Sequence, residues 1–572
     1  MSGNFVFLSE RFSVLEKIGG LAENYLYADP NACLYKMGIF AETMVNCMFE
    51  IDKRKQPTGS NNTQANKLKI LQNDKIIDAA ISGIFHRLRV TRNEAVHSNY
   101  DSFEDSVTLI EQTHTLSVWF MRAYGDPDYE PLKFVMPEDI RGQKDYKKII
   151  EENERLAAEL EKALAAALAK PEYTRVSKEE RRRRAENASR GMRLSEREIR
   201  FITDEQLRRA GWEADTFSLR YSKGTRPQKN RNIAIAEWPT DLTVCMWGYM
   251  SYALFAGLKM VGTVEIAVDR FTDLPDSVNV QCREYSMGVK EEHHCYVIDM
   301  RRRHKVPFLF AANARAYEKE RALKTGVWFC DMRGRSKEPR ALHGWYSPDE
   351  LLALLGSGGC AADADRALKD LPIDTLCGAK GLGLRPYQAE ALMAAETAVL
   401  NGKKTALLKM AAGTGKTRIV PGMVHRYLKT GRFKRILLLV DETSSGGQVP
   451  NIFKELALEN GATADKLYRI RGLNADNDGG GAEVCVSTVR DMRERIFLNG
   501  GESAPTVAEY DLIIADDALH GFPQKKEADG GLDADDYLAA LEYFDAVKII
   551  LAADETCYPP DILGEPVFSY PG

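Results

Sequence analysis

The sequence predicts a multidomain α/β protein, and three observations along its 572 residues support this prediction. Apolar residues recur at helical spacing through residues 1–135, where proline is scarce. Strand-like and helix-like pieces alternate between residues 200 and 356. Residues 384–572 alternate apolar strands with helices, which is the pattern of a parallel sheet covered by helices. At roughly 150 residues per domain, the length suggests about four domains.

The composition is that of an ordinary globular protein, with 44% apolar and 28% charged residues. The formal net charge of −5 argues against a chain that coats nucleic acid over its whole surface, although local basic stretches remain available. Ten cysteines occur without a Cys-x-x-Cys pair, which fits a reducing compartment and suggests no zinc site. The chain start lacks signal-peptide character and no apolar run approaches about 18 residues, so we expect a cytoplasmic protein that does not enter a membrane.

The N-terminal elements come first. Two stretches, NACLYKMGIFAETMVNCMFEI and DAAISGIFHRLRV, predict a compact helical module over residues 1–135. Residues 136–176 predict a helical arm rich in Glu, Lys, Ala and Leu, with one apolar stripe of leucines spaced four apart. The arm either packs along its neighbours or contacts a coiled-coil partner. The stripe is too short for several heptads, which favours the first interpretation.

The middle and C-terminal elements follow. Residues 177–356 predict an α/β domain that opens with the basic stretch 178–200, either a solvated helical face or a segment that contacts phosphates. Within it, YALFAGLKMVGTVEIAVD predicts a strand, a turn and a second strand. The Gly/Ala-rich residues 357–383 are predicted to be a linker. Residues 384–572 are predicted to be a parallel α/β domain.

The motif KMAAGTGKT lies between the apolar strand TALL and the helical stretch RIVPGMVHRYLK. A strand, a glycine loop, Gly-Lys-Thr and a helix form a phosphate-binding loop, in which backbone N–H groups and the helix N-terminus cradle phosphate oxygens. The lysine would reach the β- and γ-phosphates and the threonine hydroxyl would ligate Mg²⁺, so the expected cofactors are ATP and Mg²⁺. The predicted phosphate-loop residues are Gly413, Thr414, Gly415, Lys416 and Thr417.

The stretch LRPYQAEAL, upstream of this loop, places Arg385 and Gln388 at the start of a predicted helix. An ordinary helix start would explain these residues if they stood alone. Motor proteins of helicase superfamily 2 place such a glutamine against adenine, where its amide can both donate and accept. Together with the phosphate loop, the stretch therefore favours adenine recognition by Arg385 and Gln388.

Residues 384–572 resemble the first RecA-like motor domain of the restriction (R) subunit of type I restriction–modification systems. The resemblance rests on RILLLVDETSSGGQVPNIF, CVSTVRDM, EYDLIIADDALHGF and KIILAADETCYPPDILGEPVFSY. It implies that Asp516 is the Walker-B aspartate that helps to hold Mg²⁺. It also implies that Asp517 stands where the family has the catalytic glutamate. Aspartate is one methylene shorter, and a misplacement of about 1 Å can cost roughly a hundredfold in rate.

Residues 207–240 and GYMSYALFAGLKMVGTVEIAV are similar to the family's PD-(D/E)xK nuclease domain, which uses carboxylates to hold Mg²⁺ and a lysine to orient water. The resemblance implies that Ser251 replaces a metal-binding aspartate and Ala267 replaces the lysine. Taken alone, Glu265 would be an ordinary strand residue. We expect the fold to be present and the cleavage chemistry to be lost. The nuclease-site residues that the resemblance retains are Glu237, Glu265, Gln281 and Tyr285.

The stretch TRNEAVHS carries Arg92 and His97, a spacing that looks like the motif of HEPN-type helical domains, some of which cleave RNA. A spacing of five places the two side chains about 140° apart on an ideal helix, so a helix end or bend is needed for convergence. The helical module is therefore either a structural or docking module or a ribonuclease.

The resemblance implies three domains: an HEPN-like helical module, a PD-(D/E)xK nuclease-like α/β domain and a single RecA-like domain. The first hypothesis is an R-subunit-like protein that binds ATP and duplex DNA and assembles with methyltransferase and specificity subunits. Its family couples ATP hydrolysis to DNA translocation and cleavage. The second is a non-catalytic regulator or decoy, and the third is an HEPN ribonuclease. The resemblance ends with the first motor lobe at Gly572, so we expect nucleotide binding with poor turnover, because a second lobe would supply arginine fingers.

Overall fold

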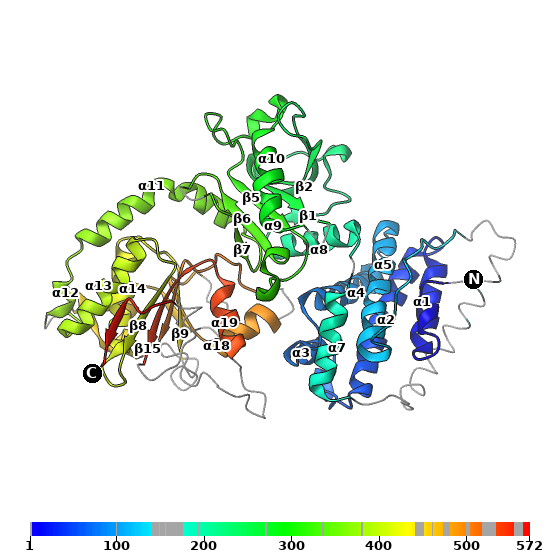
Figure 1. Cartoon of the computed structure of the whole chain (residues 1–572), viewed down its shortest axis with the longest axis horizontal. Helices are drawn as coiled ribbons and strands as arrows, with labels where there is room; N and C mark the ends of the chain where they lie inside the picture. The colour runs from blue at the N-terminus through cyan, green and yellow to red at the C-terminus, as the bar shows by residue number, and fades with distance from the viewer. Residues whose placement is uncertain are drawn as a thin grey trace.

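The structure is a computed structural model of the chain, and it arranges the described elements in three lobes (Figure 1). In the described part of the chain, no helix combines the length and the apolar character needed to cross a bilayer. The described residues are 3–139 except 99; 148, 151 and 155; 176–440 except 193, 269–271, 335–336 and 379–380; and 451–571 except 460, 473–480, 499–503, 517–533 and 554–563. Most of the predicted arm over residues 136–176 therefore lies outside the described residues.

The N-terminal lobe is the predicted helical module, and its core surrounds the long helix α2. Helix α2 begins at Pro30 because Asp29 caps it, accepting a hydrogen bond from Ala32 N at 2.9 Å. The elements of this lobe are η1 (Val6–Leu8), α1 (Ser13–Tyr25), α2 (Pro30–Ile51), η2 (Gly59–Asn61), α3 (Gln64–Asn73), α4 (Ala79–Ser98), α5 (Phe103–Phe120) and η3 (Met121–Gly125).

Helix α7 (Lys178–Arg190) packs on the helical module, although the sequence division groups it with the middle domain. Ala185 and Ala188 enter the core of the module, and Trp119 Nε1 donates to Ala185 O at 3.2 Å. Arg181 is buried against Asp52, and Arg183 and Arg184 pair with Glu180. Much of the basic stretch thus forms ion pairs within the protein, which favours its structural interpretation.

The middle lobe contains a seven-stranded mixed sheet in which the strands follow chain order. Strands β2, β3 and β4 are antiparallel neighbours, and β4 then pairs with β5 in parallel. The elements are α8 (Glu196–Arg209), β1 (Glu213–Ala214), η5 (Tyr221–Lys223), β2 (Asn232–Pro239), β3 (Tyr249–Ala256), β4 (Lys259–Ile266), α9 (Leu274–Ser277), η6 (Val278–Cys282), α10 (Arg283–Met287), η7 (Glu291–Tyr296), β5 (Phe308–Ala312), η8 (Lys319–Lys324), β6 (Val327–Asp331) and β7 (Arg340–Leu342).

Helix α11 (Pro348–Asp370) connects the middle lobe to the C-terminal lobe (Figure 1). It starts at a capping box formed by Ser347 and Glu350, and it continues through the predicted boundary at residue 356. The short helix α12 (Asp374–Cys377) follows. The predicted Gly/Ala-rich linker over residues 357–383 is thus largely helical in the residues described, because alanine offsets the glycines and the start is well capped.

The C-terminal lobe is the predicted parallel α/β domain, built on a seven-stranded sheet of order β12-β13-β9-β14-β15-β8-β16. All described pairings in this sheet are parallel. Its central strands are buried and apolar, as expected for a sheet with helices on both faces. The elements are α13 (Pro386–Leu400), β8 (Thr405–Met410), α14 (Lys416–Lys429), β9 (Ile436–Val440), α16 (Ile452–Glu455), β10 (Ala457–Glu459), β11 (Ala462–Thr463), α17 (Ala464–Leu467), β12 (Ile470–Gly472), β13 (Val484–Thr488), α18 (Val489–Arg493), η9 (Glu494–Leu498), β14 (Leu512–Asp516), α19 (Ala534–Tyr543), β15 (Val547–Ala552) and β16 (Phe568–Tyr570).

The middle and C-terminal lobes contact each other through both polar and apolar side chains. Asp545, just before β15, accepts hydrogen bonds from Arg340 Nη2 at 2.6 Å and from Tyr346, and it lies 3.5 Å from Lys404. Val507 of the C-terminal lobe is buried in the core of the middle lobe. The two sheets are therefore joined by more than the connecting helix.

Candidate functional site

The phosphate-loop motif forms a strand, a tight loop and a helix, as the sequence predicts. Strand β8 ends at Met410 and α14 starts at Lys416. Gly413 and Gly415 both have a φ of +79°, a left-handed conformation that glycine adopts without steric cost. A Cβ on Gly415 would also lie 2.6 Å from Gln388 Nε2. The backbone therefore requires glycine at Gly415 for two separate reasons.

Lys416 and Thr417 occupy the first turn of α14, where helix N–H groups and the positive end of the helix dipole favour anions. Lys416 is 4% exposed, and its Nζ donates to Met410 O at the end of β8, at 3.1 Å. Thr417 is exposed. This donor set, with the loop amides around Thr414, fits the phosphates of a nucleotide.

Gln388 positions the phosphate loop in this structure. Its Nε2 donates to Thr414 O at 2.9 Å and to Gly415 O at 3.3 Å, while its Oε1 accepts from Arg385 N at 3.0 Å. The buried carboxamide thereby caps α13 and holds the loop at once. Recognition of adenine by Arg385 and Gln388 stays a prediction.

Two tyrosines complete the support of the loop, and the sequence reasoning gave neither this role. Tyr387 OH donates to Thr414 O at 2.9 Å, and its ring stacks on Tyr570 with centroids 4.1 Å apart. Ala411 N donates to Tyr570 O at 3.0 Å. The LRPYQ stretch supplied a signal for Tyr387, but the pairing of β16 with β8 is a long-range contact that no local pattern predicts.

Asp516 is the last residue of β14 and is buried. Strand β15 lies between β14 and β8, with Asp516 opposite Leu551 and Leu551 opposite Leu408. Because parallel strands end at one edge, Asp516 and the phosphate loop lie on the same edge of the sheet. Asp517 lies outside the described residues, as do residues 441–450 and 554–563.

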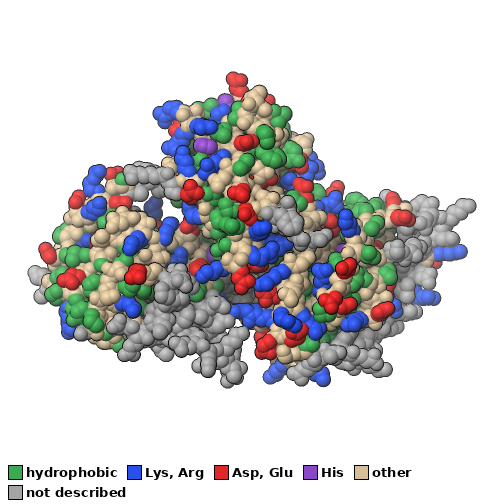
Figure 2. Space-filling view, in the orientation of Figure 1, with side chains coloured by type: hydrophobic (Ala, Val, Ile, Leu, Met, Phe, Trp, Pro, Cys, Tyr) green, Lys and Arg blue, Asp and Glu red, His purple; other side chains and the backbone are tan. Residues whose placement is uncertain are grey.

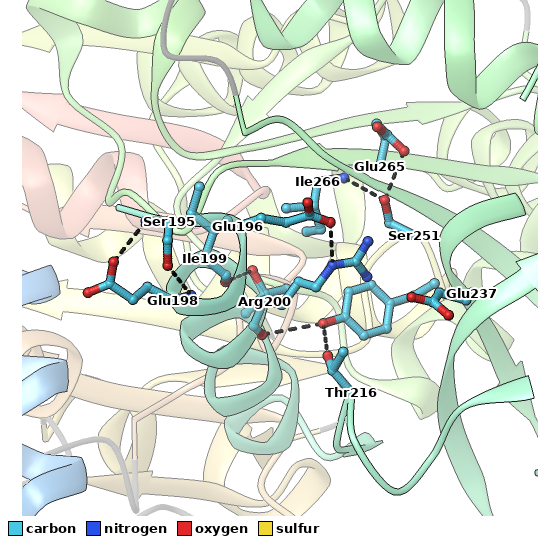
Figure 3. Close-up of polar contacts among 12 residues, drawn as sticks. Ser195, Glu196, Glu198, Ile199, Arg200, Thr216, Glu237, Ser251, Glu265 and Ile266 are labelled. Carbon is cyan, nitrogen blue, oxygen red and sulfur yellow. Dashed lines mark hydrogen bonds and ion pairs between the residues drawn. The ribbon is translucent and has the colours of Figure 1, made fainter. Parts of the chain in front are cut away.

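In the middle lobe, Glu265 on β4 is held by two hydroxyl donors, of which Figure 3 shows Ser251. Ser251 Oγ and Tyr285 OH each donate to Glu265 Oε2 at 2.9 Å, and Ser251 Oγ accepts from Ile266 N at 3.1 Å. Burial raises the pKa of Glu265, and the two hydroxyl hydrogen bonds partly oppose that rise. The structure thus brings Ser251, Glu265 and Tyr285 together, and their role in a nuclease site stays a prediction.

Glu237 lies on β2, where the pairing with β3 passes from Ala236 to Trp238. Its φ of +52° is left-handed, a conformation that costs a non-glycine residue about 1 kcal/mol or more. Its carboxylate forms an ion pair with Arg220 Nη1 at 3.4 Å. Backbone strain of this kind concentrates at functional sites and next to bulges.

Arg200 on α8 is a residue of this site that the sequence reasoning did not single out. Its Nε donates to Glu196 at 3.0 Å, and its guanidinium points toward Ser251 and Glu265 (Figure 3). Burial lowers the pKa of Arg200, but Tyr252, Glu196 and Glu237 more than offset it and the pKa is raised. The only sequence signal was the (i, i+4) pair with Glu196 in a basic stretch.

These residues do not fit a Mg²⁺ site. Within the described ranges, no three His, Cys, Asp or Glu side chains are grouped to hold a metal ion. One oxygen of Glu265 already accepts two hydroxyl groups, and Glu237 is paired with Arg220. Gln281 is half-buried in η6, one turn before Tyr285, and among the described residues it makes no hydrogen bond to either glutamate.

Arg92 and His97 both lie on α4, which runs unbroken to Ser98. Arg92 Nη1 pairs with Glu42 Oε2 at 2.5 Å and its guanidinium lies over the Tyr35 ring, whereas His97 is exposed. The continuous helix keeps the two side chains about 140° apart. Within one chain, the bend or helix end that would bring them together does not occur between them.

Comparisons with known proteins match each lobe. Residues 213–355 match the family "Type I restriction enzyme EcoKI endonuclease subunit second domain", and residues 381–553 match "Type III restriction enzyme, res subunit". Residues 21–129 match a domain of unknown function, DUF4145.

The type I restriction enzyme EcoKI endonuclease subunit of Escherichia coli (strain K12) is 32% identical to this chain, over 99% of the chain and 54% of the relative. A solved structure from Vibrio vulnificus YJ016, described as a fragment of an HsdR subunit of a type I restriction enzyme, shares 18% identity and covers 66% of this chain and 59% of that one. Its TM-score of 0.23 carries no argument about the fold. The chain spans about half the length of the curated relative. With sequence similarity along almost all of its residues, the chain belongs to the family of type I restriction enzyme endonuclease subunits.

Proposed function

We propose that this chain is an R-subunit-like protein that binds ATP with Mg²⁺ and duplex DNA, and that it does not cleave DNA. On this proposal it assembles with the methyltransferase and specificity subunits of a type I restriction–modification complex. Its lobes act as an HEPN-like helical module, a silent PD-(D/E)xK nuclease-like domain and one RecA-like motor lobe. Family membership and the geometry of the phosphate loop support the proposal.

The observation that carries ATP binding is the glycine loop between β8 and α14. The amides of Gly413 to Gly415 and the ammonium of Lys416 would hold the phosphates, and Thr417 with Asp516 would hold Mg²⁺. When bound, Mg²⁺ neutralises charge on the phosphates. Gln388 and Tyr387 keep the loop in shape by bonding its carbonyl groups, so the binding geometry is held before the nucleotide arrives.

Loss of cleavage is supported by the state of the two retained carboxylates. Metal-assisted hydrolysis needs oxygen ligands free to bind the ion and a group that orients water. Here Glu265 accepts hydroxyl groups from Ser251 and Tyr285, and a buried alanine stands at position 267. The positive charge of Arg200 beside this site opposes the entry of a divalent cation.

ATP turnover depends on Asp517, which the resemblance places at the position of the catalytic glutamate. A carboxylate that is one methylene shorter holds the attacking water less well, and we propose that turnover is slow. ATP binding without any hydrolysis would favour the second hypothesis, a non-catalytic regulator or decoy.

Nucleotide titration tests the ATP site. A fluorescent ATP analogue with Mg²⁺ should bind the unaltered chain, and Lys416→Ala should weaken binding by about a hundredfold because a buried cation at the phosphates is lost. Lys403→Ala, an exposed lysine just before β8, is the matched control and should bind as the unaltered chain does. Equal binding by Lys416→Ala and Lys403→Ala would refute nucleotide binding at this loop.

A nuclease assay tests the silent domain. Incubation with supercoiled DNA, Mg²⁺ and ATP should leave the DNA intact. If nicking appears and is lost in Glu265→Gln, the site is active and the proposal of a silent nuclease is wrong. Nicking that persists in Glu265→Gln would come from a contaminant, and a repeat with repurified protein should then show none.

A further inference from the structure

The helical module contains a cavity of about 720 Å³ that no step of the proposed function uses. It lies between the end of α2, helix α3 and the start of α7. Cationic side chains dominate its lining. They are Lys53, Arg54, Lys55, Lys178 and Arg181.

Two aspartates in the lining are already neutralised by these cations. Asp52 accepts from Arg54 Nε at 3.1 Å and from Arg181 Nε at 2.9 Å, and Asp74 pairs with Arg54 and with Lys178 Nζ at 3.1 Å. The lining therefore has three more cations than carboxylates. The aspartates also fix the two guanidinium groups in place, which reduces the entropy lost when they bind a ligand.

Lys53 is placed at the cavity by an unusual backbone conformation. It follows the last residues of α2 with a φ of +50°, a position that glycine usually takes at a helix end. Arg54 N donates to Phe49 O at 2.9 Å and closes the helix. The conformation costs a lysine about 1 kcal/mol, and such strain is often retained where the side chain has a role. Lys53 and Lys55 are exposed, and neither forms an ion pair with another described residue.

Figure 2 shows Lys and Arg side chains interspersed with Asp and Glu over the face of the helical module where α3 and α7 lie. The excess of cations is thus a property of the cavity and does not extend over the face as a continuous basic stripe. A nucleic-acid backbone needs a basic stripe or groove along several phosphates. A concave site with a local excess of positive charge suits a compact anion better.

We propose that this cavity binds a phosphorylated small molecule of nucleotide size. Its volume falls within the range of about 300–1,000 Å³ that small-molecule sites occupy. Lys53, Lys55 and Lys178 contact the phosphates, and the guanidinium groups of Arg54 and Arg181 form the base of the site. Ile70 and Val176 provide the apolar wall for the uncharged part of the ligand. The site is independent of the proposed nucleotide loop in the motor lobe.

The test uses the full chain carrying Lys416→Ala, so that binding at the motor loop does not contribute. Isothermal titration with inorganic tripolyphosphate should detect one site per chain, weakened by raised salt. Adding Lys53→Glu and Lys55→Glu should lower the affinity by about tenfold or more, because two attractive charges become repulsive. These two lysines lie outside the Arg54–Asp52–Arg181 network, so the fold is retained, which circular dichroism checks.

The matched control carries Lys17→Glu and Lys133→Glu, two exposed lysines of the same module with the same change of net charge. It should bind tripolyphosphate as the Lys416→Ala parent does. No binding by the parent, or an equal loss in the control, would overturn the proposal. If the double Lys53/Lys55 variant binds tripolyphosphate normally but loses a 20-base-pair duplex, the surface reads nucleic acid and the small-molecule site is also overturned. The chain with Lys53→Glu and Lys55→Glu but an unaltered Lys416 is also titrated with the fluorescent ATP analogue. It should still bind the analogue at the motor loop, so failure of the cavity site and failure of the motor-loop site are distinguished.

Discussion

At the scale of single residues, polar groups around Glu265 occupy the oxygens that a metal ion would need. Ser251 places a hydroxyl group where the resemblance puts a carboxylate, and that hydroxyl group bonds Glu265 directly. Arg200 adds a positive charge that acts on Glu265. A hydroxyl donor and a guanidinium thereby offset the burial of the Glu265 carboxylate.

Tyr285→Phe tests this balance. It removes the 2.9 Å hydrogen bond to a buried carboxylate and should lower the free energy of unfolding by about 1–2 kcal/mol. Urea unfolding followed by tryptophan fluorescence measures the change. Tyr249→Phe, a tyrosine at the start of β3 that is half exposed, should change stability little. Equal stability of the two variants would show that Tyr285 does not support Glu265.

Glu198 predicts a pH dependence of stability. Burial raises its pKa from 4.5 to about 7, opposed by hydrogen bonds from Ser195 and Thr115. The folded state holds the Glu198 proton more tightly than the unfolded state does. Protonated Glu198 therefore stabilises the folded state fully below about pH 4.5, and this stabilisation is lost as the pH rises to about 7. Over that window Glu198 should cost about 3 kcal/mol of stability.

Glu198→Gln should flatten this slope, because an amide does not titrate. Unfolding midpoints at several pH values between 4.5 and 8 measure it. Glu196→Gln on the same helix α8 is the control, since its side chain is 56% exposed. An unchanged slope in Glu198→Gln would assign the pH dependence to other buried acids.

At the scale of elements, the phosphate loop depends on two helices and two strands. Helix α14 provides the amides at its N-terminus, and α13 provides Gln388, whose carboxamide bonds the loop carbonyls. Strand β16 pairs with β8 and supplies Tyr570 to the stack. The loop is thus held on both sides before any ligand binds.

Gly415→Ala should therefore weaken nucleotide binding by about tenfold or more. The added Cβ would meet Gln388 Nε2 at 2.6 Å and would sit at a φ of +79°, so either the Gln388 carboxamide must leave the loop carbonyls or the loop must shift. Gly402→Ala is the matched control, because its φ is +78° but no atom lies within 4 Å of its Cβ position. Titration with a fluorescent ATP analogue measures the affinity of both variants. Only Gly415→Ala should lose affinity, and an equal loss in Gly402→Ala would show that the effect does not come from the shape of the phosphate loop.

At the scale of the whole molecule, Asp545 of the C-terminal lobe bonds Arg340 and Tyr346 of the middle lobe. Burial raises the pKa of Asp545, but Lys404, Arg340 and Tyr346 outweigh it and hold the pKa well below its usual range. Asp545 lies two residues before β15, which lies between β14 and β8 in the sheet. A ligand that stabilises the motor sheet should therefore also stabilise β7 and the start of α11.

Asp545→Asn should uncouple the two lobes and cost about 2 kcal/mol, a value reduced for the partial exposure of Arg340. With the unaltered chain, ATP and Mg²⁺ should slow hydrogen exchange in both lobes. In the Asp545→Asn variant, ATP and Mg²⁺ should slow hydrogen exchange in the motor lobe alone. Asp363→Asn, an exposed residue of α11, should behave as the unaltered chain does. If ATP and Mg²⁺ still slowed hydrogen exchange in both lobes of the Asp545→Asn variant, transmission through Asp545 would be ruled out.

The sequence by itself determined the class of each lobe and the residues of the phosphate loop. Helical periodicity, buried apolar strands and the GTGKT spacing are local patterns, and local patterns follow from backbone geometry and burial. Family membership also followed from the order of these motifs. The sequence also showed Ser251 and Ala267 at the positions where the resemblance implies a nuclease aspartate and lysine.

Only the tertiary structure decided which groups surround Glu237 and Glu265. Arg200 lies on α8 before the sheet, Arg220 lies between β1 and β2, and Tyr285 lies on α10 between β4 and β5. Their meeting at Glu237 and Glu265 therefore depends on long-range packing. Long-range packing also places α7. The sequence groups this helix with the middle domain, but its buried alanines lie in the core of the helical module. Side chains distant in sequence meet because apolar surfaces must be buried together, and no local pattern encodes that partner choice.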